Sequence, residues 1–232
     1  MWTKTMSPQM ILQQIKNRYP IEEKTIPLIT NQIHMTIVDD PDQLLDTLSK
    51  EDQCGTLHLP YWTYLWPSAI GLARYLDLSR EFEGERTLEI GCGFGLAGIV
   101  ACQKGGVVLF TDYERDTLTF ARYNALQNRC AGRASFVQMD WNTPCLKGKF
   151  SRILASDVIY EDTHWNPILT LLQTYLAPDG EAIFSEPNRT SASGFLERVS
   201  RYGFTYTEQT DDVVGLDGVV FKITIYCLTR DT

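Results

Sequence analysis

The sequence predicts an α/β fold: a doubly wound sheet of seven mostly parallel strands, preceded by an N-terminal α+β extension. From residue 67 onward, short β-branched and apolar runs alternate with longer amphipathic stretches, the pattern of a parallel sheet with helices on both faces. A glycine-rich turn joins the first of these strands to its helix, and an acidic residue ends the next strand. The last two strands have no helix between them, so we expect them to form a hairpin with one antiparallel strand.

The chain of 232 residues fits one large domain with an extension in front of it. Residues 8–18 have an amphipathic helical pattern, 33–38 alternates as a strand does, and 41–50 is typical of a second short helix. We therefore separate an extension at residues 1–60, a candidate substrate-recognition lid, from a domain at 61–232.

Each element of the domain follows from a local signal. Pro67 stands in the first turn of a helix, where proline is preferred, and apolar residues follow it at helical spacing. Glycines at 105–106 and the Pro-Asp-Gly sequence at 178–180 mark turns before strands. In chain order, the expected strands are 86–90, 107–111, 134–139, 151–156, 181–185, 204–209 and 219–227, and the expected helices after the one at Pro67 are 96–104, 114–127, 164–176 and 191–202.

Composition and charge narrow the class of protein. Hydrophobic residues make up 44% of the chain, enough for a core, and no run of about 18 apolar residues is present, so we expect no membrane span. The formal net charge of −8 argues against general nucleic-acid binding, which depends on neutralising phosphates. It agrees better with a basic or neutral partner, such as a lysine-bearing protein surface.

The cysteines and histidines do not predict a metal site. The 6 cysteines include no C-x-x-C pair, and the 3 histidines, at 34, 58 and 164, do not have metal-ligand spacing. The cysteines are typical of free thiols in a reducing cytoplasm. The sequence leaves the oligomeric state open.

The segment 86–98 is the most informative part of the chain. It combines a buried strand, a turn with glycines at 91, 93 and 95, and the start of a helix. Glycine permits a positive φ and lets backbone N–H groups approach a ligand closely, and the helix start offers further free N–H groups. This arrangement is typical of a nucleotide-cofactor loop, although glycines alone also occur in ordinary strand-to-helix turns.

Two acidic residues select the cofactor. A dinucleotide loop has the spacing G-x-G-x-x-G, and its third glycine would fall on Leu96. Glu89 precedes Gly91 by two residues, and its carboxylate would repel a pyrophosphate but attract the ammonium and sulfonium groups of S-adenosylmethionine. Asp112 follows Gly91 by 21 residues, where α/β nucleotide folds place an acid on the ribose hydroxyls. We therefore expect S-adenosylmethionine as cofactor and S-adenosylhomocysteine as product.

Four motifs occur in a characteristic order. They are Tyr-Leu-Trp-Pro-Ser-Ala-Ile-Gly-Leu-Ala-Arg-Tyr-Leu at 64–76, E-I-G-C-G-F-G at 89–95, Asp140-Trp141 after the third strand, and Ser156-Asp-Val-Ile-Tyr160 after the fourth. Together they resemble the class I S-adenosylmethionine-dependent methyltransferases, whose fold is Rossmann-like. More narrowly, they resemble the methyltransferase-16 group of protein-lysine methyltransferases, over about residues 60–190.

Two shorter motifs narrow the resemblance further. Pro60-Tyr-Trp62 and Glu186-Pro-Asn-Arg189 are similar to one branch of the group. That branch contains the lysine methyltransferase of the electron-transfer flavoprotein β-subunit and its bacterial relatives.

The resemblance implies a role for each matching position. By this resemblance, Trp66 would close over the cofactor, and Gly91, Cys92 and Gly93 would pass beneath its methionine end. Asp112 would bind the ribose, Asp140 and Trp141 would lie at the adenine, and Ser156 would line the floor of the cofactor site. Asp157 and Tyr160 match the D-x-x-Y motif of the group, which faces the methyl-transfer point. Glu161 stands where some members have an aromatic residue, and Cys92 replaces a commoner serine or threonine.

These residues suit methyl transfer to an amine. The reaction is an in-line displacement, so alignment alone supplies roughly 7–11 kcal/mol. A lysine acceptor must arrive neutral although its usual pKa is about 10.4. We expect Asp157 to position it, with Tyr160 as second choice and Glu161 or Glu186 as a helper, while the proton passes to water or to a neighbouring acid. Aromatic faces would favour the cationic groups, and the candidates are Tyr61, Trp62, Trp66 and Trp141.

Structural interpretations of the same residues stay open. Asp157 could cap the helix that follows it, and Tyr160 could be a packing residue. Trp62 and Trp66 could belong to the core. Asp140-Trp141 could be a capped turn with a buried indole.

The leading prediction of function is methylation of a lysine side chain of a protein. The alternatives are a small-molecule N- or O-methyltransferase and a non-catalytic cofactor-binding module, because the fold hosts many acceptors. A nucleic-acid amino-methyltransferase is disfavoured, since residues 156–160 do not have the D/N-P-P-Y/F motif in which such enzymes resemble one another.

Overall fold

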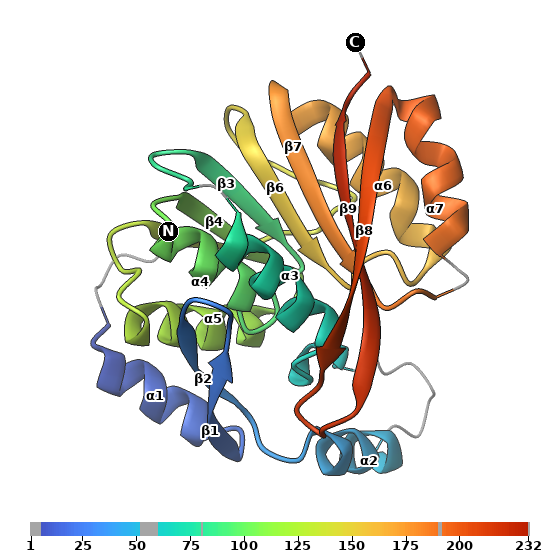
Figure 1. The fold of residues 1–232 in the computed structure, drawn as a ribbon. Coiled ribbons are helices and arrows are strands. Elements are labelled where there is room, and N and C mark those ends of the chain that lie inside the picture. Colours follow the sequence, from blue (N-terminus) through green and yellow to red (C-terminus); the bar gives the residue numbers. More distant parts are fainter. Residues whose placement is uncertain (1–5, 52–59, 80, 190–191, 232) are drawn as a thin grey trace.

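The computed structural model describes residues 6–51, 60–79, 81–189 and 192–231, and it has the predicted α/β architecture (Figure 1). A seven-stranded sheet in the order β5-β4-β3-β6-β7-β9-β8 carries helices on both faces. Its strands are β3 (Arg86–Ile90), β4 (Val107–Asp112), β5 (Ala134–Gln138), β6 (Phe150–Ser156), β7 (Leu176–Glu186), β8 (Phe204–Val214) and β9 (Val220–Arg230). The domain's helices are α3 (Pro67–Leu78), α4 (Leu96–Gln103), α5 (Arg115–Gln127), α6 (Asp162–Tyr175) and α7 (Ala192–Val199), with short 3₁₀ helices η1 (Tyr61–Thr63) and η2 (Ser200–Tyr202).

The sheet is parallel except at one side. Strands β3 to β7 pair in parallel, whereas β9 is antiparallel to both β7 and β8, so the predicted terminal hairpin is confirmed. Strand β3 pairs with β4 on one side and with β6 on the other. The chain order therefore reverses at β3, and in open α/β sheets a crevice forms at the carboxyl ends of the strands at such a point.

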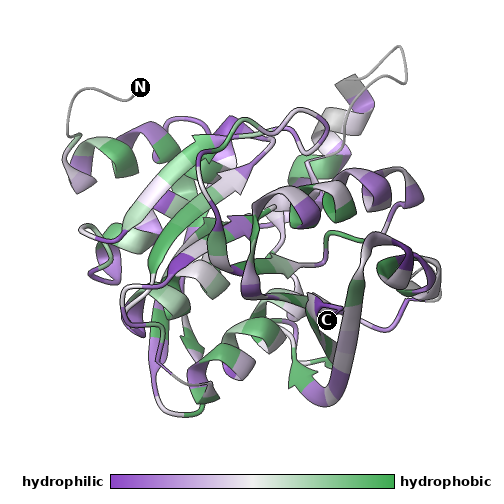
Figure 2. Cartoon of the chain, turned by 90° about the horizontal axis from the view of Figure 1, so that it is seen from above, coloured by the Kyte–Doolittle hydropathy of each residue, from purple (hydrophilic) through white to green (hydrophobic). Residues whose placement is uncertain are grey.

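Two hydrophobic clusters lie on opposite faces of the sheet. One contains Leu72 of α3 and Phe120 of α5, and the other contains Leu172 of α6. Along β6, Leu154 belongs to the first cluster and Ile153 to the second, as the alternation of a strand requires. Figure 2 shows the hydrophobic residues along the strands and on parts of the helices. Packing on both faces fixes the strand ends from which the polar site residues come.

The N-terminal extension is attached to this core. Its elements are α1 (Pro8–Lys16), β1 (Ile21–Pro27), β2 (Gln32–Val38) and α2 (Pro41–Glu51). Strands β1 and β2 form a separate antiparallel pair, and the helix α1 and strand β2 lie against α5. Ile11, Ile26 and Ile33 are buried in the first cluster with residues of α4 and α5. The extension thus shares a core with the domain, and a functional boundary at residue 60 stays a prediction.

Some expected boundaries were wrong. The Pro-Asp-Gly sequence at 178–180 does not precede a strand but lies inside β7, where Phe150 pairs with Leu176 and Arg152 with Glu181. Three extra β7 residues are therefore accommodated as a bulge opposite β6. Strand β1 was not expected, because Glu22, Glu23 and Lys24 obscure its alternation. Cys54 and His58 lie outside the described residues.

A single buried amide joins three parts of the fold. The Asn124 side chain is fully buried; its nitrogen donates to the carbonyl oxygens of Thr36 and Phe94, both at 3.1 Å, and its oxygen accepts from the Thr36 N–H at 2.8 Å. It therefore connects α5 to strand β2 of the extension and to the glycine turn after β3.

We predict that Asn124→Ala lowers the free energy of unfolding by about 2–4 kcal/mol, because it leaves buried backbone groups without partners. Urea unfolding followed by circular dichroism measures this loss. Asn166→Ala, which removes an exposed amide bonded to Arg198, is the matched control and should cost less than about 1 kcal/mol. Equal losses in the two variants would contradict the structural role of Asn124.

Candidate functional site

A cavity of about 590 Å³ lies at the carboxyl edge of the parallel strands. Its walls come from the ends of β3, β4 and β6, the segment 61–66, residues 139–142 after β5, and the turn into α6. All eleven residues predicted for the site line this one cavity: Trp66, Glu89, Gly91, Cys92, Gly93, Asp112, Asp140, Trp141, Ser156, Asp157 and Tyr160. The volume is within the usual range for a small-molecule site.

The glycine turn between β3 and α4 has the left-handed backbone that the sequence predicts. Gly91, Gly93 and Gly95 have φ values of +58°, +51° and +83°. A Cβ on Gly91 would lie 3.2 Å from the Trp141 ring and 2.9 Å from a Val158 methyl carbon. Glycine at 91 is therefore needed both for the conformation of the turn and for the close approach of Trp141.

Glu89 brings a carboxyl group to the floor of the cavity. Its side chain is 2% exposed, and the Gly98 N–H donates to the carboxylate. Its Oε2 atom is buried and has no hydrogen-bond partner among the described residues. Burial raises the pKa of Glu89 to about 8. A Cβ on Gly98 would lie 2.4 Å from that Oε2 atom, so only glycine leaves room for the carboxyl group.

Asp112, at the end of β4, is tied to the glycine turn. Its Oδ2 atom accepts from the Gly93 N–H and its Oδ1 atom from the Glu114 N–H, both at 3.0 Å. Burial raises the pKa of Asp112 to about 6, and the two backbone hydrogen bonds oppose that rise. Strand β4 thus presents a second carboxyl group, whose orientation is fixed by these two hydrogen bonds, beside the glycine turn.

The far end of the cavity has an indole and a half-buried acid. Asp140 Oδ1 accepts from the backbone and side-chain nitrogens of Asn142, at 2.8 Å and 2.9 Å. These hydrogen bonds lower the pKa of Asp140. The Trp141 Nε1 atom is buried with no partner among the described residues, and its ring meets that of His164 edge-on at 5.1 Å. Both a turn and a cavity wall are therefore formed by Asp140-Trp141.

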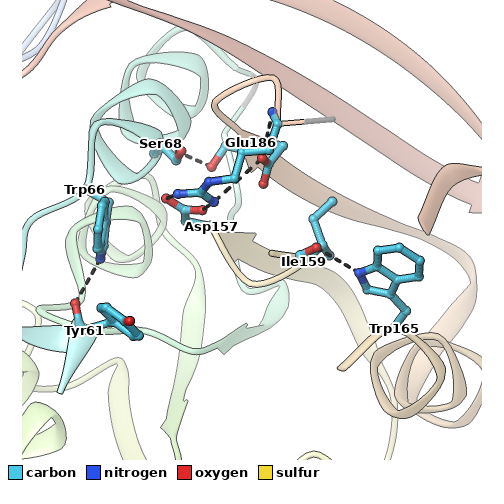
Figure 3. A network of polar contacts seen from close by, with 9 residues as sticks. Tyr61, Trp66, Ser68, Asp157, Ile159, Trp165 and Glu186 are labelled. Carbon is cyan, nitrogen blue, oxygen red and sulfur yellow. Dashed lines mark hydrogen bonds and ion pairs between the residues drawn. The ribbon is translucent and has the colours of Figure 1, made fainter. Parts of the chain in front are cut away.

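Aromatic side chains form the wall beside Asp157 (Figure 3). The Trp66 Nε1 atom donates to the Tyr61 carbonyl oxygen at 2.9 Å, which fixes the indole across the cavity from Asp157. The rings of Tyr61 and Tyr160 meet edge-on at 6.5 Å. Tyr160 is 36% exposed, and burial of the rest of its side chain raises its pKa.

Trp62 is mainly a packing residue. Its ring meets Tyr19, Phe94 and Phe120 at centroid distances of 5.5 Å, 6.1 Å and 5.7 Å, although it also contributes to the cavity wall. The interpretation of Trp62 as a core residue therefore holds, whereas Trp66 lies at the cavity.

Asp157 occupies a strained turn after β6. Its φ is +55°, which is uncommon for a residue with a side chain, and its N–H donates to the Ser185 carbonyl oxygen at 2.9 Å. Both carboxylate oxygens bond the guanidinium of Arg189. Burial raises the pKa of Asp157 and Arg189 opposes that rise. Asp157 does not cap α6, because the N-cap position is Glu161.

Four functional candidates were not assigned from the sequence. Arg189 was noted only as part of a short motif, and nothing in its spacing predicted the contact with Asp157. His164 and Glu114 line the cavity without any sequence signal, and Gly98 is explained only by the position of Glu89. Of the two proposed helpers, Glu161 lines the cavity, whereas Glu186 lies behind Asp157 and outside the lining.

Comparison with known proteins agrees with this geometry. A sequence model of the family described as lysine methyltransferase matches residues 61–202. The "Histidine protein methyltransferase 1 homolog" of Dictyostelium discoideum is 32% identical over 123 residues, which cover 50% of this chain and 40% of that protein. The "Protein-lysine N-methyltransferase rrg1" of Schizosaccharomyces pombe is 36% identical over 150 residues, which cover 58% of this chain and 48% of that protein. The chain spans about half the length of the curated relatives it matches.

Solved structures agree on the fold. The magnesium protoporphyrin IX methyltransferase of Synechocystis PCC 6803, with bound SAH, superposes with a TM-score of 0.54, covering 70% of this chain and 82% of that one. At 18% identity the likeness concerns the fold alone.

The buried Glu89 gives a pH-dependent stability that can be measured on the cofactor-free protein. Because its pKa is raised from 4.5 to about 8, the folded state keeps a proton that the unfolded state releases between those values. Stability from this group is therefore present at low pH and falls as pH rises. Between pH 5 and pH 8 we predict that the wild-type protein loses about 2–4 kcal/mol more unfolding free energy than Glu89→Gln.

Urea unfolding across this pH range measures the difference. The control is Glu197→Gln, which changes an exposed carboxyl group on α7 and should follow the wild-type curve. Parallel wild-type and Glu89→Gln curves would mean that Glu89 is not a buried, protonated acid.

Proposed function

Since the chain belongs to the lysine methyltransferase family, we propose that it transfers methyl groups from S-adenosylmethionine to a lysine side chain of a protein. The observation that carries this proposal is the chemistry of the cavity. Glu89, Asp112 and Asp157 bring three buried carboxyl groups to one space that also has aromatic walls. Such a lining favours a cationic cofactor and an amine acceptor over an anionic ligand.

The residues at the glycine turn fit S-adenosylmethionine. The unpartnered Oε2 of Glu89 offers a buried acceptor for an ammonium group, and Asp112 offers a carboxylate for ribose hydroxyls. The backbone of Gly91 to Gly93 would pass beneath the methionine end, Ser156 would line the floor, and Trp141 would flank the adenine with Asp140 nearby. When bound, this cofactor supplies a methyl group on a positively charged sulfur.

On the acceptor side, Asp157 and Tyr160 orient the amine. Asp157 is held by its turn and by Arg189, so its carboxylate needs little reorganisation to receive an N–H donor. Tyr160 and Tyr61 present ring edges and faces beside it, and Trp66 closes the opposite side. Alignment of amine and methyl group by these residues is the main catalytic contribution, and the lysine proton passes to water before transfer.

Other features are consistent with a protein acceptor. The net charge of −8 suits a lysine-bearing surface. Tyr64 of the domain lines the cavity, and its hydroxyl donates to Asp42 of α2, which supports the proposal that the extension at residues 1–60 is a substrate-recognition lid. The resemblance to the branch of the electron-transfer flavoprotein enzyme stays a prediction.

We also propose a cytoplasmic location. The five cysteines in the described part of the chain are free thiols, as expected in a reducing compartment. No helix in that part is both long and apolar enough to cross a membrane.

Transfer of labelled methyl groups tests the proposal. The purified protein is incubated with methyl-radiolabelled S-adenosylmethionine and lysate of its source, and the products are resolved on a gel. A discrete labelled protein band supports a protein methyltransferase. Label only in the small-molecule fraction would support the small-molecule alternative, and cofactor binding without any label would support the binding module.

We predict that Asp112→Ala weakens S-adenosylmethionine binding about 100-fold, because it removes the charged acceptor to which two ribose hydroxyls would donate hydrogen bonds. Isothermal titration calorimetry measures the change. Asp179→Ala, at an exposed position in the β7 bulge, serves as the control and should bind like the wild type. Unchanged binding in Asp112→Ala would remove the ribose assignment.

We predict that Asp157→Asn keeps cofactor affinity within about threefold but lowers the rate of label transfer about 100-fold or more, since the amide carries no negative charge to stabilise the nitrogen as it becomes positive during transfer. The two quantities are measured by calorimetry and by label incorporation. Asp162→Asn, an exposed acid in the first turn of α6, is the matched control. Normal transfer by Asp157→Asn would exclude its catalytic role.

A further inference from the structure

Asp157 is contacted by a cation from outside the cavity. Its carboxylate lines the cavity, whereas Arg189 and Glu186 are not among the lining residues. Arg189 bonds both Asp157 oxygens in a forked arrangement, and the Nη2–Oδ2 distance is 3.3 Å. Figure 3 shows Asp157 between the aromatic pair Tyr61 and Trp66 on one side and Glu186 on the other. The guanidinium thus lies behind the carboxylate that faces the methyl-transfer point.

The position of Arg189 is determined by the structure around it. Its backbone N–H donates to Glu186 Oε1 at 3.2 Å, and its Nη1 lies 3.7 Å from the same oxygen. The preceding residue, Asn188, has a φ of +56°, and its side-chain oxygen accepts from the Thr224 hydroxyl at 2.5 Å. Two neighbouring turns, after β6 and after β7, therefore both have left-handed residues with side chains. Strained residues of this kind persist where the surrounding structure holds them, and they cluster at functional sites.

The charges around Asp157 come from several elements. Its own turn contributes Tyr160 and Glu161, β7 contributes Glu186, and the loop after β7 contributes Arg189. Asp112 of β4 and Tyr61 of η1 interact electrostatically with Tyr160. Tyr226 of β9 interacts in the same way with Glu186 and with Glu208 of β8. Arg189 is the only cation among these named groups of the described residues, and the others are acids or phenols.

We infer that Arg189 is a positioning residue that orients Asp157 and, by its positive charge, keeps the acceptor amine unprotonated. This inference rests on the proposed function, because it concerns the acceptor of that reaction. Arg189 orients the Asp157 carboxylate by hydrogen bonds, and its positive charge acts on the acceptor amine from the other side of that carboxylate. It therefore need not touch the acceptor.

The chemistry of the acceptor explains why a cation is useful at this place. Transfer forms a nitrogen–carbon bond while the sulfur–carbon bond breaks, and the positive charge moves from sulfur to nitrogen. The nitrogen lone pair must be free, so the lysine has to lose its proton to water beforehand. A lone carboxylate would bind the ammonium form as an ion pair and hold that proton. Arg189 offsets most of this attraction while leaving Asp157 able to accept a hydrogen bond from the neutral amine.

Glu186 contributes to the same balance. It is fully buried, and its Oε2 atom has no hydrogen-bond partner among the described residues. Burial and the nearby Asp157 raise the pKa of Glu186 to about 7, and Arg189 opposes that rise. Without Arg189, two carboxyl groups would face each other with no cation between them. The cluster is therefore built so that its net charge beside the acceptor stays near neutral.

The test is the pH dependence of methyl transfer in Arg189 variants. Label incorporation into the acceptor band of source lysate is measured from pH 6.5 to 10 at saturating cofactor, with the lysate diluted in steps to obtain an apparent KM. For Arg189→Gln we expect an alkaline shift of about one pH unit in the rate profile. On the rising limb this is a tenfold lower rate, recovered at high pH, with an apparent KM that does not rise. Arg189→Lys, which keeps the charge, should retain most of the wild-type profile.

Controls separate this role from a structural one. Arg198→Gln removes a cation on α7 that lies over Trp165 and bonds Asn166, and it should keep the wild-type profile. A rate of Arg189→Gln that is reduced equally at every pH, or a profile that does not move, would overturn the inference while leaving the proposed function intact. A wild-type protein that binds S-adenosylmethionine but labels no protein at any pH would overturn the proposed function and this inference with it.

Discussion

The structure depends on burying acidic groups at one edge of a sheet. Glu89 lies one residue before the end of β3, Asp112 ends β4, and Asp157 follows β6. These strands are neighbours in the order β4-β3-β6, so the three carboxyl groups converge on one cavity. Burying a carboxylate without a counter-ion is unfavourable, and raised pKa values at Glu89 and Asp112 are the result. Only Asp157 has a cationic partner among these three in the described part of the chain. For the other two, we propose that a bound ligand supplies the partner groups.

Rigid surroundings make this acidic cavity possible. Packing on both faces of the sheet fixes the strand ends, and the Asn124 amide joins the glycine turn to the N-terminal extension. The extension has two parts with different relations to the site. Its first helix and two strands support α5, whereas α2 reaches the cavity wall through the hydrogen bond between Tyr64 and Asp42. The half of the cavity beside the glycine turn is thus bonded to the core, whereas the half beside Asp157 is formed largely by turns and short segments.

Local patterns were sufficient to predict most of the fold and the composition of the cavity wall. Strand-helix alternation, the glycine turn and the positions of Glu89 and Asp112 are all short-range signals, and each is confirmed as structure. Their proposed roles toward a ligand stay predictions. The contact between Arg189 and Asp157 could not be predicted, because 32 residues separate the two and the parallel pairing of β6 with β7 brings them together. Strand β1 was missed because its charges follow no alternation that a single sequence reveals.

The identity of the methylated residue tests the central claim most directly, because named relatives of this chain include both a histidine and a lysine methyltransferase. The labelled acceptor protein is hydrolysed to amino acids, and the radioactive product is separated by chromatography beside methylated standards. Methyl-lysine as the labelled product is the expected result, since an acid beside aromatic walls suits a flexible aliphatic amine. Label in methylhistidine or methylarginine would contradict a lysine acceptor for this cavity.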